Sequence, residues 1–140
     1  MGAAPAGPAP NASAPTKVTL TPVDNKMKYA TTEFTVEPGQ EIRLVFENTA
    51  TSASMQHNVV VLDTDEKSVM KSVAQAGLSV GPSGDYVPDH DAILAHTSLS
   101  KPGDTVEVTF TAPETPGKYG YLCTFPGHWS TMQGTMHVEE

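Results

Sequence analysis

Four side chains that can bind a soft metal ion stand in two parts of this sequence. Cys123, His128 and Met132 follow one another within ten residues, spaced Cys-x4-His-x3-Met, and His57 lies far upstream, just before a valine-rich run. One thiolate, one thioether and two imidazoles are the ligand set of a trigonal copper site that exchanges single electrons. Soft sulfur donors stabilise Cu(I) and imidazoles suit both oxidation states, so the metal needs to move little when an electron arrives.

The segment that carries three of these donors is predicted to fold back on itself. Pro126-Gly127 supplies a tight turn, which aims Cys123 and His128 at a common point. His128 and Met132 are four residues apart, so they share a face if this stretch forms a helical turn. His57 is expected to come from a neighbouring strand as the fourth donor.

Other chemistry for these residues fits the sequence less well. Zinc explains Met132 poorly, because its usual ligands are thiolate, imidazole and carboxylate. A Cys–His nucleophile pair needs an orienting group, and none stands nearby. Residues 119–138 contain no Asp, Glu, Lys or Arg, whereas charged residues make up 17% of the chain. A loop built for hydrolysis would more often supply a carboxylate, so the uncharged segment favours a buried metal.

The composition excludes several function classes. At 140 residues the chain is long enough for one ordinary domain. A formal charge of −8 argues against binding to nucleic acid, which is met by Lys and Arg. A single cysteine excludes intramolecular disulfides and multi-thiolate metal sites. The longest apolar run, residues 59–62, is far too short to span a bilayer.

Alternation of apolar and polar residues predicts an all-β protein. The clearest strand pattern is Val106, Val108 and Phe110, and residues 57–62 look like a more deeply buried strand. Apolar residues recur at helical spacing between residues 65 and 77, and residues 77–98 read as loop. Seven or eight short strands with one helical insertion indicate an antiparallel β-sandwich.

The first residues differ in composition from the rest of the chain. Residues 1–16 contain six Ala, four Pro and two Gly and carry no charged side chain. Such a segment has too little apolar side chain to offset the entropy of ordering it. We therefore expect a flexible tether at residues 1–16 and a single domain at residues 17–140.

The string CTFPGHWSTM at residues 123–132, together with the upstream QHN at residues 56–58, resembles the single-domain cupredoxins, and among them the auracyanin group. The resemblance covers roughly residues 17–140. It implies a Greek-key β-sandwich that holds one type 1 (blue) copper ion at one end. It also implies that His57, Cys123, His128 and Met132 bind the copper, and that Asn58 and Thr124 brace the two ligand segments. The apolar side chains beside His128 could be ordinary packing residues, but we expect them to line an apolar patch through which electrons enter and leave. These residues are Phe125, Pro126 and Trp129.

The same resemblance implies an electron carrier rather than an enzyme. In phototrophic bacteria, auracyanins take electrons from a quinol-oxidising membrane complex and pass them to a c-type reaction-centre cytochrome. For this chain we expect a monomer on the periplasmic side, without contact to nucleic acid. We also expect that an upstream segment, now removed, held a signal or membrane anchor.

Two alternatives remain open from the sequence. A copper storage or delivery module would use similar ligands, but such proteins favour exposed, exchangeable sites. A multicopper enzyme would need further centres built from histidine, and only His90, His96 and His137 remain for them, scattered along the sequence.

Overall fold

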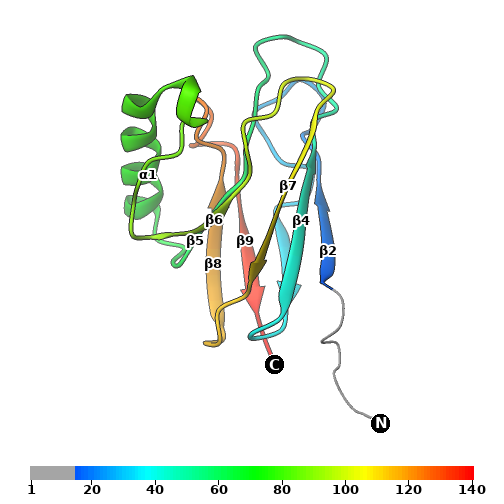
Figure 1. Cartoon of the computed structure of the whole chain (residues 1–140), viewed down its shortest axis with the longest axis vertical. Coiled ribbons are helices and arrows are strands. Elements are labelled where there is room, and N and C mark those ends of the chain that lie inside the picture. The colour runs from blue at the N-terminus through cyan, green and yellow to red at the C-terminus, as the bar shows by residue number, and fades with distance from the viewer. Residues whose placement is uncertain (1–14) are drawn as a thin grey trace.

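The computed structural model describes residues 15–140, which form two β-sheets packed face to face with one helix beside them (Figure 1). The smaller sheet has the strand order β2 (Thr16–Leu20), β4 (Glu41–Glu47), β7 (Thr105–Thr111). The larger has the order β3 (Glu33–Val36), β9 (Gln133–Val138), β8 (Gly117–Leu122), β5 (Val60–Leu62), β6 (Ile93–His96). This arrangement of strands confirms the predicted sandwich.

Two strand pairs differ from the antiparallel pattern expected from the sequence. β2 pairs with β4 in parallel, and β3 pairs with β9 in parallel. The chain passes from one sheet to the other between β2 and β3, and back again between β3 and β4. Because successive strands lie in different sheets, neighbours within one sheet can run in the same direction.

The inner faces of the two sheets enclose one main core. In β4 the residues Ile42, Leu44, Val45 and Phe46 are buried, while the charged residues of that strand are exposed. The core continues up to the donors Cys123 and Met132, which belong to the same buried cluster. These two candidate metal ligands are therefore part of the hydrophobic core and do not lie on the surface.

Helix α1 (Lys67–Val80) covers part of the larger sheet (Figure 1). Its buried residues include Met70 and Val73, which form a second apolar cluster with residues of β5 and β8. A Cβ atom at Gly120 of β8 would lie 2.1 Å from Cε of Met70 and 3.3 Å from the Thr64 carbonyl oxygen, so the end of the Met70 side chain would have to move. The helix was predicted between residues 65 and 77 and continues three residues further, to Val80.

Two sequence predictions need correction. Residues 93–96 form strand β6 at the edge of the larger sheet, although residues 77–98 were expected to be loop. The strand is short and leaves Leu94 exposed, so its pattern gave little signal. The expected strand at 57–62 is regular only from Val60, because His57 pairs through an isolated bridge with Ser100. All six residues are nevertheless buried, as predicted.

The loop of residues 123–132 lies at the end of the sandwich opposite the C-terminus (Figure 1). The predicted tether falls mainly on residues 1–14, which lie outside the described residues, and β2 begins at Thr16. None of the helices in residues 15–140 is long and apolar enough to cross a lipid bilayer.

The hydroxyl of Tyr29 should stabilise the fold measurably. It is buried and donates a hydrogen bond of 2.6 Å to the backbone carbonyl of Asn58. Tyr29→Phe leaves that carbonyl without this donor, so the free energy of unfolding should fall by about 1–3 kcal/mol. Urea unfolding of the metal-free protein measures the loss.

Tyr119→Phe is the matched control, because the Tyr119 hydroxyl also donates to a carbonyl, that of Thr115, but in a part-buried position. We expect the smaller loss there. Equal losses at the two positions would show that burial of the Tyr29 hydrogen bond adds nothing.

Candidate metal centre

Three of the four predicted donors converge on one point. The Sγ atom of Cys123 lies 3.9 Å from Nδ1 of His57 and 3.8 Å from Nδ1 of His128, and the two Nδ1 atoms are 3.2 Å apart. Within residues 15–140 these side chains form the only group of three or more His, Cys, Asp or Glu close enough to share an ion. The thiol and the two imidazoles thus lie together although 66 residues separate His57 from Cys123.

The spacing of these atoms fits a bound transition-metal ion. Nitrogen and sulfur donors lie about 2.0–2.3 Å from such an ion, so three donors around one centre are about 3.5–4 Å apart. The observed separations are close to this range. Met132 is fully buried in the same core cluster as Cys123, which adds a thioether to the surroundings. Two imidazoles, one thiolate and a nearby thioether suit copper better than zinc.

The backbone around His57 is fixed by Ser100 on the adjacent segment. The N–H of His57 donates to the carbonyl of Ser100 at 3.1 Å, and the N–H of Ser100 donates back at 2.7 Å. The hydroxyl of Ser100 donates to the same His57 carbonyl at 2.8 Å. The amide of Asn48 in turn donates to the carbonyls of Ser100 and Met55. These contacts hold His57 although no regular strand contains it.

The loop of residues 123–132 folds back as its sequence predicted. The N–H of His128 donates to the carbonyl of Phe125 at 3.0 Å, and Gly127 has a φ of 84°. Proline followed by glycine with positive φ is typical of a type II turn. The N–H of Met132 donates to the carbonyl of His128 at 2.9 Å, which forms the expected helical turn. The N–H of Cys123 then donates to the Met132 carbonyl at 3.0 Å and closes the loop.

Asn58 connects the two ligand segments. Its Nδ2 donates to Oγ1 of Thr124 at 2.9 Å, and its Oδ1 accepts from the Thr124 backbone N–H at 2.9 Å. Both residues are buried. Since Asn58 follows His57 and Thr124 follows Cys123, this double hydrogen bond fixes two donors relative to each other.

Burial keeps the three donors uncharged when no metal is bound. Desolvation raises the pKa of the Cys123 thiol to about 12, while the backbone N–H groups of Asn58 and Phe125 oppose this by hydrogen bonding to it. Desolvation, and secondly repulsion by His128, lowers the pKa of His57 to about 4. Burial also lowers the pKa of His128. A metal ion must therefore displace the thiol proton, and the two N–H groups favour the thiolate that remains.

The predicted docking residues belong to the same loop as His128, the one ligand with any exposed surface. His128 is 3% exposed, whereas His57, Cys123 and Met132 are fully buried. The ring of Phe125 lies 4.9 Å from that of His128. Pro126 is exposed and Trp129 half-buried. All three line a hollow of about 260 Å³ between this loop and residues 74–78 of α1.

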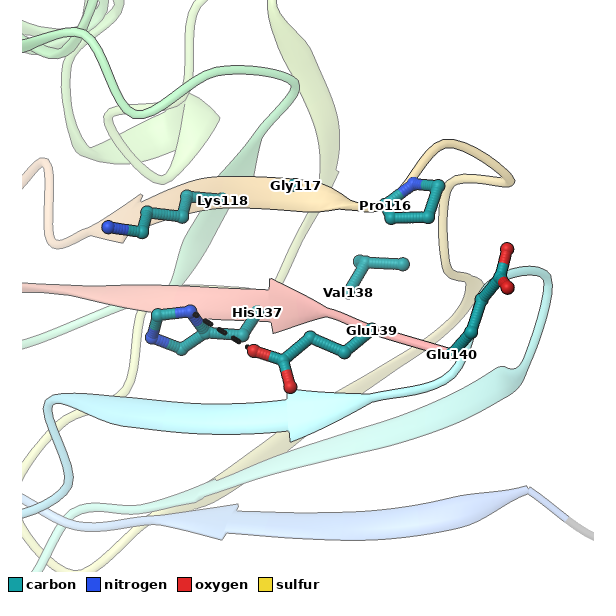
Figure 2. A pocket seen from close by; sticks show the side chains of 7 residues that line it. All are labelled: Pro116, Gly117, Lys118, His137, Val138, Glu139 and Glu140. Carbon is teal, nitrogen blue, oxygen red and sulfur yellow. Dashed lines mark ion pairs between the residues drawn. The ribbon is translucent and has the colours of Figure 1, made fainter.

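The other histidines lie away from the centre. His90 bonds to Ser72 and to the backbone N–H of Ala92, and Nδ1 of His96 bonds to the carbonyl of Thr97. His137 lies 2.8 Å from Glu33 and 4.0 Å from Glu139. His137 lies beside a hollow of about 610 Å³ that is lined by residues 116–118 and 137–140 (Figure 2). This hollow is near the start of β8, at the opposite end of that strand from Cys123. None of them joins the donor cluster.

Several residues that support the centre gave no sequence signal. They are Ser100, Asn48 and Asp85, and all three are distant in sequence from residues 123–132. Asp85 takes part through its carbonyl, which accepts a hydrogen bond from Asn58. Polar residues in loops are common, so only the folded chain reveals which of them contact the donors.

Comparison with known proteins agrees with this geometry. The family model described as copper binding proteins, plastocyanin/azurin family, matches residues 16–139. Auracyanin-A of Chloroflexus aurantiacus is 39% identical over 127 residues, which cover 90% of this chain and 76% of that protein. The solved structure of auracyanin A from this photosynthetic bacterium superposes with a TM-score of 0.83 at 37% identity, covering 90% of this chain and 100% of that one. Dithionite-reduced auracyanin from the photosynthetic bacterium Roseiflexus castenholzii gives 0.82 at 35% identity, covering 91% and 100%.

The connection through Asn58 should contribute strongly to stability in the absence of metal. Asn58→Ala removes the donor and the acceptor that meet Thr124, so buried groups lose their partners. We expect the free energy of unfolding to fall by about 2–4 kcal/mol. Chemical denaturation of the metal-free protein gives this value.

Thr124→Val provides a graded control, since it removes only Oγ1 and keeps the backbone N–H that donates to Asn58. Its loss should be about half as large. If Asn58→Ala costs no more than Thr124→Val, the two segments are not held together by this side chain.

Proposed function

Because the chain belongs to the plastocyanin/azurin family of copper-binding proteins, we propose that it is a blue copper protein that carries single electrons on one ion held by His57, Cys123, His128 and Met132. The observation that carries this proposal is the convergence of a buried thiol and two buried imidazoles within 3.9 Å of one another. When bound, copper supplies a Cu(I)/Cu(II) couple that accepts and releases one electron.

The four side chains have distinct tasks in this proposal. The sulfur of Cys123 would supply a covalent contact, and the N–H groups of Asn58 and Phe125 stabilise it as thiolate. His57 and His128 would hold the ion through their Nδ1 atoms, so their protons would stay on Nε2. Met132 would offer its thioether as a further, weaker sulfur donor, which would tune the reduction potential.

The burial of the donors supports electron transfer over copper storage or delivery. His57, Cys123 and Met132 are fully buried, and the loop of residues 123–132 is closed by backbone hydrogen bonds. A delivery protein needs exposed ligands that a receiving site can capture. A closed centre exchanges its metal slowly but still allows an electron to pass through His128.

The other histidines give no support for an enzyme with several copper ions. A further copper centre would require histidines close to one another, and His90, His96 and His137 make separate local contacts. We therefore propose a carrier with one copper per chain and without catalytic activity of its own.

The surface around His128 is proposed as the docking face for redox partners. Phe125, Pro126 and Trp129 give this surface apolar character, and residues 119–138 contain no Asp, Glu, Lys or Arg. Docking there would rest on apolar contact, whereas the net charge of −8 would act on approach and is screened by salt.

The wider role is proposed from the relatives. The two auracyanin structures compared above come from photosynthetic bacteria. We propose that this chain works as a monomer outside the cytoplasm, attached to the membrane through its N-terminal side. There it would carry electrons from a quinol-oxidising complex to a c-type reaction-centre cytochrome.

Cys123→Ser tests the copper site directly. The wild-type protein loaded with Cu(II) should bind one copper per chain and show an intense sulfur-to-copper charge-transfer band that bleaches on reduction. The variant should lose this band, because the sulfur that donates the charge is gone. Visible and electron paramagnetic resonance spectra measure the difference.

His96→Gln is the matched control, since His96 lies outside the donor cluster and should leave the band intact. Colour that survives in Cys123→Ser would rule out Cys123 as the ligand. Rapid copper loss from the wild-type protein to a chelator would favour delivery instead.

A single charge on the proposed docking face should slow electron exchange. Ser130 is exposed and lines the hollow with Phe125, Pro126 and Trp129. In the self-exchange reaction two copies meet through the same face, so Ser130→Glu brings two negative charges together. We expect the rate to fall about tenfold at low salt and to recover as salt is added. Line broadening in NMR spectra of mixed oxidation states measures the rate.

Ser68→Glu adds the same charge to an exposed position near the start of α1, and its effect should be small. Equal slowing by the two variants would show that net charge matters and that the face around His128 does not.

A further inference from the structure

A strained corner of the backbone lies between α1 and the candidate metal centre. Asp85 and Tyr86 are adjacent, and both have a φ of 58°, in the left-handed region that side chains other than glycine rarely adopt. Each such residue costs conformational free energy. Asp tolerates this conformation better than most residues, but Tyr does not. The surrounding structure must therefore impose it.

The corner is held from the side of the helix. The N–H of Asp85 donates to the carbonyl of Pro82 at 3.0 Å, and the N–H of Tyr86 donates to the carbonyl of Gly81 at 3.0 Å. A Cβ atom at Gly77 of α1 would lie 2.3 Å from the Tyr86 carbonyl oxygen. The corner therefore sits directly on the helix backbone, and only glycine at residue 77 leaves room for it.

On its other side, Asp85 contacts both segments that hold His57. Its carbonyl accepts a hydrogen bond of 2.9 Å from Nδ2 of Asn58, the residue after His57. Its Oδ1 accepts a hydrogen bond of 3.2 Å from the N–H of Leu99. Leu99 precedes Ser100, whose backbone pairs with His57 in both directions.

Tyr86 extends the same corner to the other imidazole. Its ring meets the ring of Phe125 edge to face, with centroids 5.4 Å apart and an interplanar angle of 79°. Phe125 in turn lies 4.9 Å from the ring of His128. Two neighbouring residues thus contact the residues that stand next to both imidazoles, Asp85 through hydrogen bonds and Tyr86 through an aromatic contact.

We propose that the Asp85–Tyr86 corner is a positioning element that sets the separation of His57 and His128 around Cys123 and so tunes the electronic properties of the copper site. This inference rests on the proposed function, since it assumes that these side chains bind copper. The strain at the corner is consistent with such a role, because strained backbone persists where the surroundings fix it and it clusters at functional sites. Glycine would adopt the same φ without strain, but it would also make the corner flexible.

Gly77→Ala displaces the corner without changing any residue that touches a donor. Its added methyl group must push the Tyr86 carbonyl away, so the hydrogen bond from Asn58 and the contact with Phe125 should weaken. In the copper form we expect a changed shape of the sulfur-to-copper charge-transfer spectrum and a shifted reduction potential. In the metal-free form, the Cys123 thiol should react about tenfold faster with a thiol-modifying reagent. The reason is that losing one hydrogen bond makes the opening that exposes the thiol about tenfold more frequent.

Ser79→Ala is the control, because Ser79 is an exposed position in the last turn of the same helix. It should leave the spectrum, the potential and the thiol reaction rate unchanged. A Gly77→Ala protein that is less stable but keeps the wild-type spectrum, potential and thiol rate would overturn the proposal, since the corner would then only support the fold.

If Gly77→Ala does not fold, the variants Asp85→Gly and Asp85→Asn test whether the corner positions the donors. Asn keeps an oxygen for the N–H of Leu99 and tolerates the left-handed region, so we expect wild-type spectra and thiol reactivity. Gly removes the oxygen, so we expect the changes described for Gly77→Ala. Identical behaviour of both variants and the wild type would overturn the proposal.

The two proposals can fail separately. A wild-type copper form without the charge-transfer band would contradict the proposed function. The thiol reaction of the metal-free variants would still show whether the corner positions the donors.

Discussion

Three donors must lie side by side in a space from which water is excluded, and the rest of the structure follows from this constraint. Neutral thiol and imidazole groups can be buried at moderate cost, whereas an unpaired charge cannot. Burial raises the pKa of Cys123 and lowers those of His57 and His128, so the group carries no net charge without metal. A metal cation that replaces the thiol proton then finds donors already in place. Because the site is shielded from solvent, water weakens the attraction between the cation and the thiolate very little.

The sandwich supplies the rigidity that such a site needs. Cys123 directly follows β8, and residues 123–132 return to β9 through backbone hydrogen bonds that join Cys123, His128 and Met132. His57 is held from outside the loop, by Ser100 on one side and by Asn58 on the other. Because these contacts connect segments far apart in sequence, the donor separations depend on the whole fold. A site of fixed geometry changes little between oxidation states, which favours rapid electron exchange.

The charged side chains of this protein lie outside the loop beside His128. The chain carries a net charge of −8, but residues 119–138 contribute no charged carboxylate, ammonium or guanidinium group. A partner that docked on the loop beside His128, as proposed, would bury no charged side chain of residues 119–138, while acidic residues elsewhere would act at longer range. The strained Asp85–Tyr86 corner lies between this apolar surface and α1, where it contacts residues next to both imidazoles.

The sequence alone determined the donors, because Cys-x4-His-x3-Met with an uncharged loop and a proline-glycine turn leaves few other chemical uses. It also determined the sandwich, since period-two alternation along β4 and β7 follows directly from burying one face of a strand. It did not reveal β6, whose short exposed edge has little pattern, or the parallel pairs, which arise from crossings between sheets. Only the tertiary structure decided that Ser100, Asp85 and Tyr86 support the donors, because their contacts join segments that no local periodicity relates.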